Sequence, residues 1–185
     1  NQCSVNHVFL TGKKQIGKST FLKKVLAVYP SVPPAFTPFL ETSYSVHLFS
    51  AKLPEKQRIP TEENLLFLCG NPAYDPIERF NRLGCAALLH SDAPSLMIMD
   101  ELGPNEGKAL DFQRAVFSAL DGSVPILGVL QKTEAPFLTK IRHHPQVHVF
   151  EITEENRNDE ELADTAGGFL KYETTILCFV FTPRQ

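Results

Sequence analysis

A glycine-bounded turn between an apolar run and a segment with helical periodicity most constrains how this 185-residue chain can fold. Residues 12–19 read Gly-Lys-Lys-Gln-Ile-Gly-Lys-Ser, which fits the pattern of a glycine, four residues, and then Gly-Lys-Ser/Thr. Such a turn aims backbone N–H groups and a helix N-terminus at a polyphosphate, so it needs a strand before it and a helix after it. The sequence supplies both, because residues 8–10 are a short apolar run and apolar residues recur at helical spacing over 21–28.

Each residue type in this turn has a physical role in binding phosphate. Gly17 lets the backbone approach a phosphate without a Cβ in the way. Lys18 brings a full positive charge to the outer phosphates, and the Ser19 hydroxyl is placed to bind the Mg²⁺ that accompanies them. The predicted nucleotide-binding set is therefore Gly12, Lys13, Lys14, Gln15, Ile16, Gly17, Lys18, Ser19 and Thr20.

A second chemically suggestive stretch is the apolar run 96–99, which is followed by Asp100 and Glu101. Beside a phosphate loop, the first acid typically holds Mg²⁺, so Asp100 and Ser19 are the predicted metal ligands. Glu101 is the predicted catalytic residue, since a carboxylate at this point can polarise an attacking water. An acidic strand end is common on its own, and the phosphate loop earlier in the chain is what favours a functional role.

The remaining pattern predicts an α/β fold with a mostly parallel sheet flanked by helices, in a single domain over residues 1–185. Strands are expected at 64–69, 95–100, 124–130, 147–152 and 174–181, and a β-hairpin excursion after the first helix at 35–40 and 44–49. Helices are expected at 76–88, 109–120 and 136–143, and the charged stretch 154–164 as a solvated helix or loop. The helix at 76 carries an N-cap at Asp75 and Glu78 three residues later. The helix over 109–120 is expected to turn a face that includes Leu110 and Val116 toward the core.

Charge and composition argue against several classes of partner. Eighteen Lys and Arg against 21 Asp and Glu give a net charge of −3, with no basic stripe of the kind that nucleic acid requires. The apolar runs are too short to cross a bilayer, and no signal segment is visible at the start. The four scattered cysteines indicate reduced thiols in a cytoplasmic protein, and we expect none of them to bind metal.

Four stretches together resemble one family in their order and spacing: residues 12–20, Asp-Glu-Leu-Gly-x-x-Glu at 100–106, 140–142 and 153–157. The chain is similar to the small nucleoside-triphosphatases known from thermophilic microbes and as the human cancer-related NTPase. The resemblance implies a RecA-like phosphate-loop fold and Mg²⁺-dependent hydrolysis of nucleoside triphosphates with loose base preference. Two residues depart from the family pattern, since Gln15 replaces a glycine and His143 replaces a second arginine.

Arg142 is the second predicted catalytic residue, because it matches the basic element of this family. It would stabilise the charge of the transferring phosphoryl group, and the alternative is a surface arginine at a helix C-terminus. Arg157 is expected to be structural or part of a surface ion pair. His143, His144 and His148 are expected to be ordinary surface histidines.

Two other functions stay open at this point. A small-molecule kinase would use residues 36–49 to bind a phosphoryl acceptor, and a nucleotide-gated interaction module would bind nucleotide with little turnover. Phosphate release without an added acceptor separates hydrolysis from both alternatives. The sequence does not predict the base preference or the oligomeric state.

Overall fold

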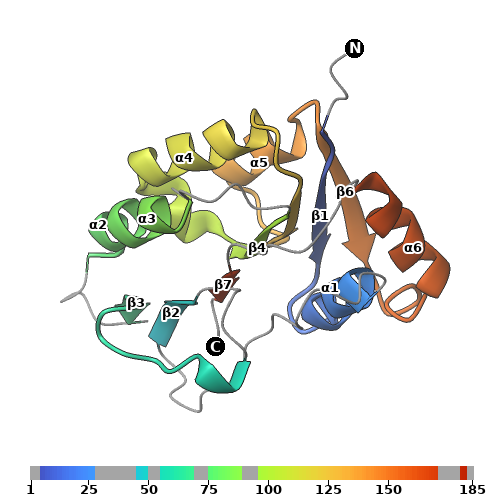
Figure 1. Ribbon diagram of the computed structural model, residues 1–185, viewed down its shortest axis with the longest axis horizontal. Helices are drawn as coiled ribbons and strands as arrows, with labels where there is room; N and C mark the ends of the chain where they lie inside the picture. The colour runs from blue at the N-terminus through green and yellow to red at the C-terminus, as the bar shows by residue number, and fades with distance from the viewer. Residues whose placement is uncertain are drawn as a thin grey trace.

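The computed structural model describes residues 5–27, 45–49, 55–68, 75–88, 96–170 and 180–182. Its centre is a parallel sheet of four strands (Figure 1), which are, in spatial order, β4 (Met97–Leu102), β5 (Ile126–Leu130), β1 (His7–Gly12) and β6 (Val147–Ile152). A second, antiparallel sheet contains β3 (Leu65–Leu68), β2 (Ser45–Phe49) and β7 (Val180–Thr182). The predicted α/β class with a mostly parallel sheet is confirmed.

Helices cover both faces of the parallel sheet. The helices α1 (Lys18–Ala27) and α6 (Glu160–Phe169) pack on one face. The other face carries α4 (Leu110–Leu120), α5 (Pro136–Arg142) and a continuous helical segment made of α2 (Pro76–Arg79), the π-helical turn η2 (Phe80–Gly84) and α3 (Cys85–Leu88). Two short 3₁₀ helices, η1 (Glu55–Gln57) and η3 (Pro104–Lys108), lie in the connections.

Strand β1 shows why both layers form. All six of its residues are buried, and successive side chains of a strand point to opposite faces. Val8 and Leu10 join the apolar layer beneath α1 and α6, whereas Phe9 joins the layer beneath α4 and α5. A strand that is apolar on both faces is stable only when helices cover both, which is the arrangement observed.

The predicted buried face of α4 is confirmed at Val116 and wrong at Leu110. Leu110, expected in the core, has 59% of its surface exposed, while Phe112, Val116 and Leu120 are fully buried. The buried stripe begins at Ala109, directly before the helix, and continues at helical spacing. Because each residue of a helix turns the side chain direction by about 100°, this start leaves Leu110 on the solvent side.

The helical segment from Pro76 to Leu88 begins as predicted, with the Asp75 carboxylate accepting a hydrogen bond from the N–H of Ile77 at 2.9 Å. Glu78, three residues after the cap, forms an ion pair with Arg82 at 3.0 Å. Both side chains of that pair are more than half exposed, so it contributes at most about 0.5 kcal/mol to stability.

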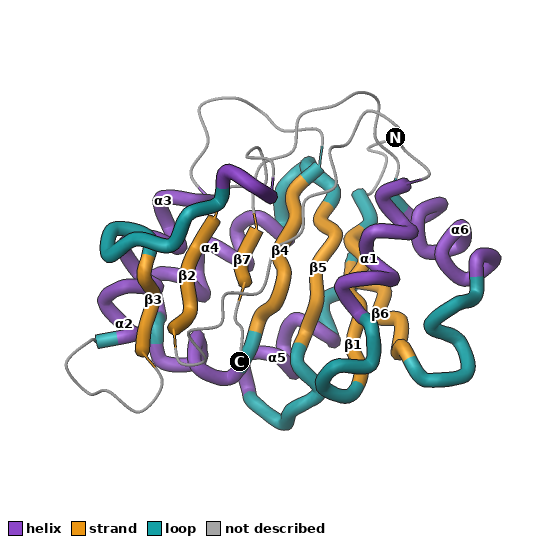
Figure 2. Tube along the Cα trace, turned by 90° about the horizontal axis from the view of Figure 1, so that it is seen from below, coloured by secondary structure: helices purple, strands orange, loops and turns teal. Residues whose placement is uncertain are grey.

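The antiparallel sheet extends the parallel one. Figure 2 shows β3, β2 and β7 side by side, with β7 next to β4. The predicted strand 35–40 lies outside the described residues, and within them β2 pairs with β3 and β7. Of the predicted strand 174–181, only residues 180 and 181 are described, and both belong to β7.

The charged stretch after β6 turns into a helix with a buried side. The Asp159 carboxylate caps α6 by accepting from the N–H of Leu162 at 3.1 Å. Ala163 and Ala166 are buried against the layer of α1, so the helix is docked rather than fully solvated. In the described part of the chain, no helix is long and apolar enough to cross a membrane.

Candidate functional site

The loop between β1 and α1 has backbone geometry that its two glycines allow. A Cβ on Gly12 would lie 2.5 Å from the carbonyl oxygen of Ile152, so no larger residue fits beside β6. Gly17 has a φ of +104°, a conformation that residues with a Cβ rarely adopt. The motif glycines therefore fix the path of the loop.

Gln15 is the third residue of this loop with positive φ, at 60°. This left-handed conformation is unfavourable for a residue with a Cβ by about 1–2 kcal/mol. The resemblance places a glycine here, and the structure gives the physical reason for that preference. The side chain of Gln15 is exposed, so the loop keeps its path without burying a polar amide.

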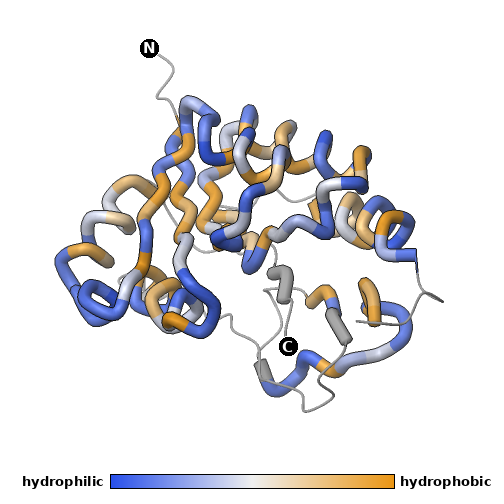
Figure 3. Tube along the Cα trace, turned by 180° about the vertical axis from the view of Figure 1, so that it is seen from behind, coloured by the Kyte–Doolittle hydropathy of each residue, from blue (hydrophilic) through white to orange (hydrophobic). Residues whose placement is uncertain are grey.

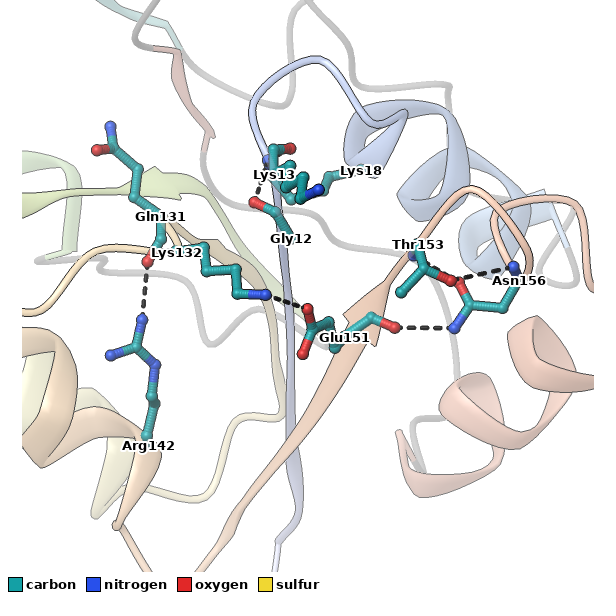
Figure 4. Close-up of polar contacts among 9 residues, drawn as sticks. All are labelled: Gly12, Lys13, Lys18, Gln131, Lys132, Arg142, Glu151, Thr153 and Asn156. Atoms are coloured by element: carbon teal, nitrogen blue, oxygen red, sulfur yellow. Dashed lines mark hydrogen bonds and ion pairs between the residues drawn. The ribbon is translucent and has the colours of Figure 1, made fainter.

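Lys18 folds back over the loop, as Figure 4 shows. Its ammonium donates to the carbonyl oxygens of Gly12 at 3.0 Å and Lys13 at 2.8 Å, and the residue is only 8% exposed. Burial lowers the pKa of Lys18, while the charges of Glu101 and Asp100 raise it in compensation. The loop lysine and the two predicted carboxylates therefore belong to one electrostatic site.

The two carboxylates lie at the carboxyl end of β4, two strands away from β1. Asp100 is 3% exposed and aligns with Val129 of β5. The register shifts between Asp100 and Leu102, and Glu101, at this irregularity, is half-buried. Parallel strands end at one edge of the sheet, so the end of β4 and the loop after β1 border the same crevice.

The donor set at this edge suits Mg²⁺. Ser19, in the first turn of α1, offers a hydroxyl, and the buried Asp100 offers a carboxylate, both hard oxygen ligands. No cluster of three or more His, Cys, Asp or Glu side chains that could hold a metal exists among the described residues. Mg²⁺ usually binds one or two protein oxygens together with substrate phosphates, and a hydroxyl with a carboxylate matches that set.

Glu106, the last acid of the Asp-Glu-Leu-Gly-x-x-Glu stretch, is buried in η3 with 4% exposure. Burial raises its pKa to about 8, and the charge of Glu101 adds to the rise. The backbone N–H groups of Glu106 and Gly103 bond to the carboxylate and act in the opposite direction. At neutral pH this carboxyl is therefore mainly protonated, unlike a surface glutamate.

Arg142, at the end of α5, forms hydrogen bonds with the backbone of the segment that follows β5. Its guanidinium donates to the carbonyl oxygen of Gln131 at 2.8 Å (Figure 4). It also donates more weakly to the carbonyl oxygen of Thr133 at 3.4 Å. These are the contacts of a residue that supports this segment. The structure thus brings Lys18, Asp100 and Glu101 together and places Arg142 beneath the neighbouring loop.

Lys132 is a charged residue at this edge that sequence reasoning missed. It follows β5 and forms an ion pair with Glu151 of β6, which spans β1 (Figure 4). The side chain of Gln131, its neighbour, packs on Gly103, where a Cβ would lie 2.7 Å from Nε2. Only the strand order, in which β5 separates β1 from β4, reveals that these residues border the site.

Of the three histidines expected at the surface, His143 is exposed, whereas His144 and His148 are partly buried. The ring of His143 bonds to the carbonyl oxygen of Thr139, and His144 pairs with Asp121 at 2.9 Å. His148 bonds to Asn6 and stacks on Phe169 with ring centroids 4.1 Å apart.

Comparisons with known proteins agree with the fold. A sequence model of a family described as NTPase matches residues 69–164. The chain is 23% identical over 159 residues to the nucleoside-triphosphatase THEP1 of Thermotoga maritima, covering 82% of this chain and 88% of that protein. It is 25% identical over 169 residues to the protein of the same name from Natranaerobius thermophilus, covering 85% and 94%.

Two solved structures share the fold. THEP1 from the hyperthermophile Aquifex aeolicus superposes with a TM-score of 0.52 at 18% identity, covering 89% of this chain and 99% of that one. A human cancer-related nucleoside triphosphatase gives a TM-score of 0.51 at 22% identity, covering 87% and 95%. The expected RecA-like phosphate-loop fold is confirmed. Because the family's sequence model spans more than half of its residues, the chain belongs to the NTPase family.

Proposed function

We propose that this protein is a Mg²⁺-dependent nucleoside-triphosphatase that hydrolyses NTP to NDP and phosphate within a single domain. The observation that carries the proposal is the shared electrostatics of Lys18, Asp100 and Glu101 at one edge of the sheet. The ammonium would bind the outer phosphates, and the backbone N–H groups of the loop would face the polyphosphate. The relatives from Thermotoga maritima and Natranaerobius thermophilus are named for this activity.

Ser19 and Asp100 would hold the Mg²⁺. When bound, the ion offsets the negative charge of the phosphates and of the transferring group. Asp100 suits this role because it offers a carboxylate at the carboxyl end of β4, and Mg²⁺ prefers oxygen ligands of this kind.

Glu101 would position the water that attacks the γ-phosphorus. The water oxygen forms a bond to phosphorus while the bond from phosphorus to the β–γ bridging oxygen breaks, so that NDP leaves. Glu101 accepts a hydrogen bond from the water and receives its proton. Its position at the irregular end of β4 leaves it half-buried, accessible to a water yet partly shielded from bulk solvent.

The substitution Glu101→Gln tests this proposal, since it keeps the shape but removes the basicity. The variant should bind a Mg²⁺–ATP complex about as well as the wild type and release phosphate at least about a hundredfold more slowly. Calorimetry and a phosphate-release assay without an acceptor measure the two quantities. Lys18→Ala is the matched control that should lose binding.

Two results would contradict this assignment. Similar hydrolysis rates for the wild type and Glu101→Gln would show that another group positions the water. A wild type that releases no phosphate alone but phosphorylates a nucleoside would favour the kinase alternative. Of the acceptor region 36–49 proposed for a kinase, only residues 45–49 are described.

A further inference from the structure

The order of the strands fixes which side of the phosphate loop faces the nucleoside, if the proposed function holds. The γ-phosphate would lie toward Asp100 and Glu101, on the side of β4 and β5. The nucleoside is at the other end of the polyphosphate and leaves the loop away from that side. Strand β6 is the neighbour of β1 on the opposite side, so the segment after β6 borders the nucleoside.

That segment, residues 153–158, is a tight loop fixed by its own side chains. The N–H of Thr153 donates to the Asn156 amide oxygen at 2.8 Å, and the N–H of Asn156 donates back to the Thr153 hydroxyl at 3.3 Å. The amide nitrogen of Asn156 also donates to the carbonyl oxygen of Glu151 at 2.9 Å (Figure 4). These bonds anchor the loop to the end of β6.

A second set of bonds ties the same loop to the helix that follows the phosphate loop. Lys24 of α1 donates to the carbonyl oxygen of Arg157 at 3.3 Å and to the side chain of Asn158 at 3.5 Å. The N–H of Asp159 bonds to the carbonyl oxygen of Asn156 at 2.9 Å before α6 begins. The backbone of Arg157 is thus held at its carbonyl oxygen by Lys24 of α1, and its own N–H donates to the carbonyl oxygen of Thr153 at 3.0 Å.

The side chain of Arg157 extends from this fixed backbone over the phosphate loop. Its Cδ lies 3.9 Å from the position of a Cβ on Gly17. The residue is exposed, and within the described ranges no hydrogen bond or ion pair engages its guanidinium. A surface ion pair, as the sequence suggested, is therefore not formed with any described residue. The aliphatic part of the Arg157 side chain therefore lies against the phosphate loop, and its guanidinium is accessible to a ligand.

The surroundings favour a neutral ligand over a phosphate. Glu154 and Glu155 are exposed in the same loop, and Asp159 and Glu160 follow directly, so added negative charge is repelled here. Figure 3 shows the hydrophilic character of this loop and of the phosphate loop. A nucleobase is neutral and flat, and the planar guanidinium of arginine stacks well on such a face.

We propose that Arg157 stacks on the nucleobase of the bound triphosphate and forms a base subsite between the loop after β6 and Gly17. Stacking recognises the face of the ring and not its edge, so this subsite accepts all four bases. The guanidinium would contribute affinity for the nucleoside without touching the reacting phosphorus.

Equilibrium binding tests this subsite independently of turnover. We would titrate wild type and Arg157→Ala with the Mg²⁺ complexes of a non-hydrolysable β,γ-imido ATP analogue and of inorganic tripolyphosphate. Arg157→Ala should weaken binding of the analogue about 5- to 150-fold, the range for loss of one stacked base, and leave tripolyphosphate binding unchanged. Arg157→Tyr, which restores a flat ring, should recover most of the affinity, whereas Arg157→Lys should not.

Arg114→Ala is the matched control, because Arg114 is an exposed arginine on α4 paired with Asp111. Equal affinity of wild type and Arg157→Ala for the analogue would overturn the base subsite. An equal loss for the analogue and tripolyphosphate would also overturn it, because it would place Arg157 on the phosphates. If the proposed function fails, the wild type releases no phosphate, and the difference between the two ligands still decides the role of Arg157.

Discussion

Two ionisable residues near the end of β4, Lys18 and Glu106, are both buried, but the charges around them have opposite effects on their ionised forms. Lys18 is buried, but the carboxylates nearby and two backbone carbonyls compensate its positive charge. Glu106 is also buried, which raises its pKa, and the charge of Glu101 adds to the rise. The same edge of the sheet therefore lowers the pKa of an ammonium group and raises the pKa of a carboxyl group.

Glu106 should make the stability of the protein fall with rising pH. Its folded pKa of about 8 exceeds the value of 4.5 expected in the unfolded chain, so between these values the folded state holds a proton that the unfolded state has lost. The free energy of unfolding then decreases by up to about 1.4 kcal/mol per pH unit across this window. Glu106→Gln removes this proton, so the variant should match the wild type near pH 4.5 and become progressively more stable than it toward pH 8.

Urea unfolding of both proteins at several pH values measures this difference. Glu134→Gln, at an exposed glutamate, is the control and should show no growing difference. A constant offset between Glu106→Gln and the wild type at all pH values would show that Glu106 is ionised in the folded protein.

At the scale of elements, His7 connects two parts of the fold at the edge opposite the site. Its Nδ1 accepts from the N–H of Ile126 at the start of β5, and its Nε2 donates to the carbonyl oxygen of Leu120 at the end of α4, at 2.8 Å. This pattern needs the neutral ring. Burial lowers the pKa of His7 below 6.5, as do His144 and His148, while the bond to Leu120 and the charge of Asp121 oppose this.

The sign of the resulting pH dependence is opposite to that of Glu106. Below pH 6.5 the unfolded chain takes up a proton that folded His7 resists, so stability is complete above this pH and is lost as the pH falls. His7→Asn, which can still donate and accept, should flatten this loss although it creates a cavity. Thermal unfolding from pH 7.5 to 5.0 measures it, with His144→Gln to separate the neighbouring ring. An unchanged slope in His7→Asn would assign the loss to another group.

Arg142 belongs to this scale as well, because it connects α5 to the segment after β5. As the predicted charge-stabilising residue, Arg142→Ala should lower kcat at least about tenfold and change nucleotide affinity much less. Loss of its backbone contacts should also lower stability by about 1 kcal/mol. Arg142→Lys is the control that keeps the charge without the fork. Equal losses of rate and affinity, or no loss, would leave Arg142 with a structural role only.

The sequence predicted those features that depend on local residues. The phosphate loop, the Asp75 cap and the bounds of α5 and β6 follow from glycine, proline and apolar spacing, which act over a few residues. The exposure of Leu110 and the burial of Glu106 depend on which element packs above each side chain. Lys132 reaches the site only because β5 lies between β1 and β4. These features depend on how the elements pack in the tertiary structure, which the periodicity of the sequence does not reveal.

At the scale of the whole molecule, the described strands run from the antiparallel sheet through β7 to β4 and on to β6 (Figures 1 and 2). Strand β7, from the last part of the sequence, lies between β2 and the strand that carries Asp100. The strand that carries Asp100 is therefore the one at which the two sheets meet. Two buried apolar layers hold the parallel part together.

The central position of β1 has a consequence for amide hydrogen exchange. Parallel partners flank β1 on both sides, and all its residues are buried, so its N–H groups should exchange with deuterium only when the whole domain opens. Mass spectrometry should find residues 8–11 among the slowest and the exposed loop residues 13–15 among the fastest, and Mg²⁺–nucleotide should protect the loop. Fast exchange in β1 would contradict this order. Residues 8–11 would thus report on global unfolding, and the adjacent residues 13–15 would report on ligand occupancy, within one peptide.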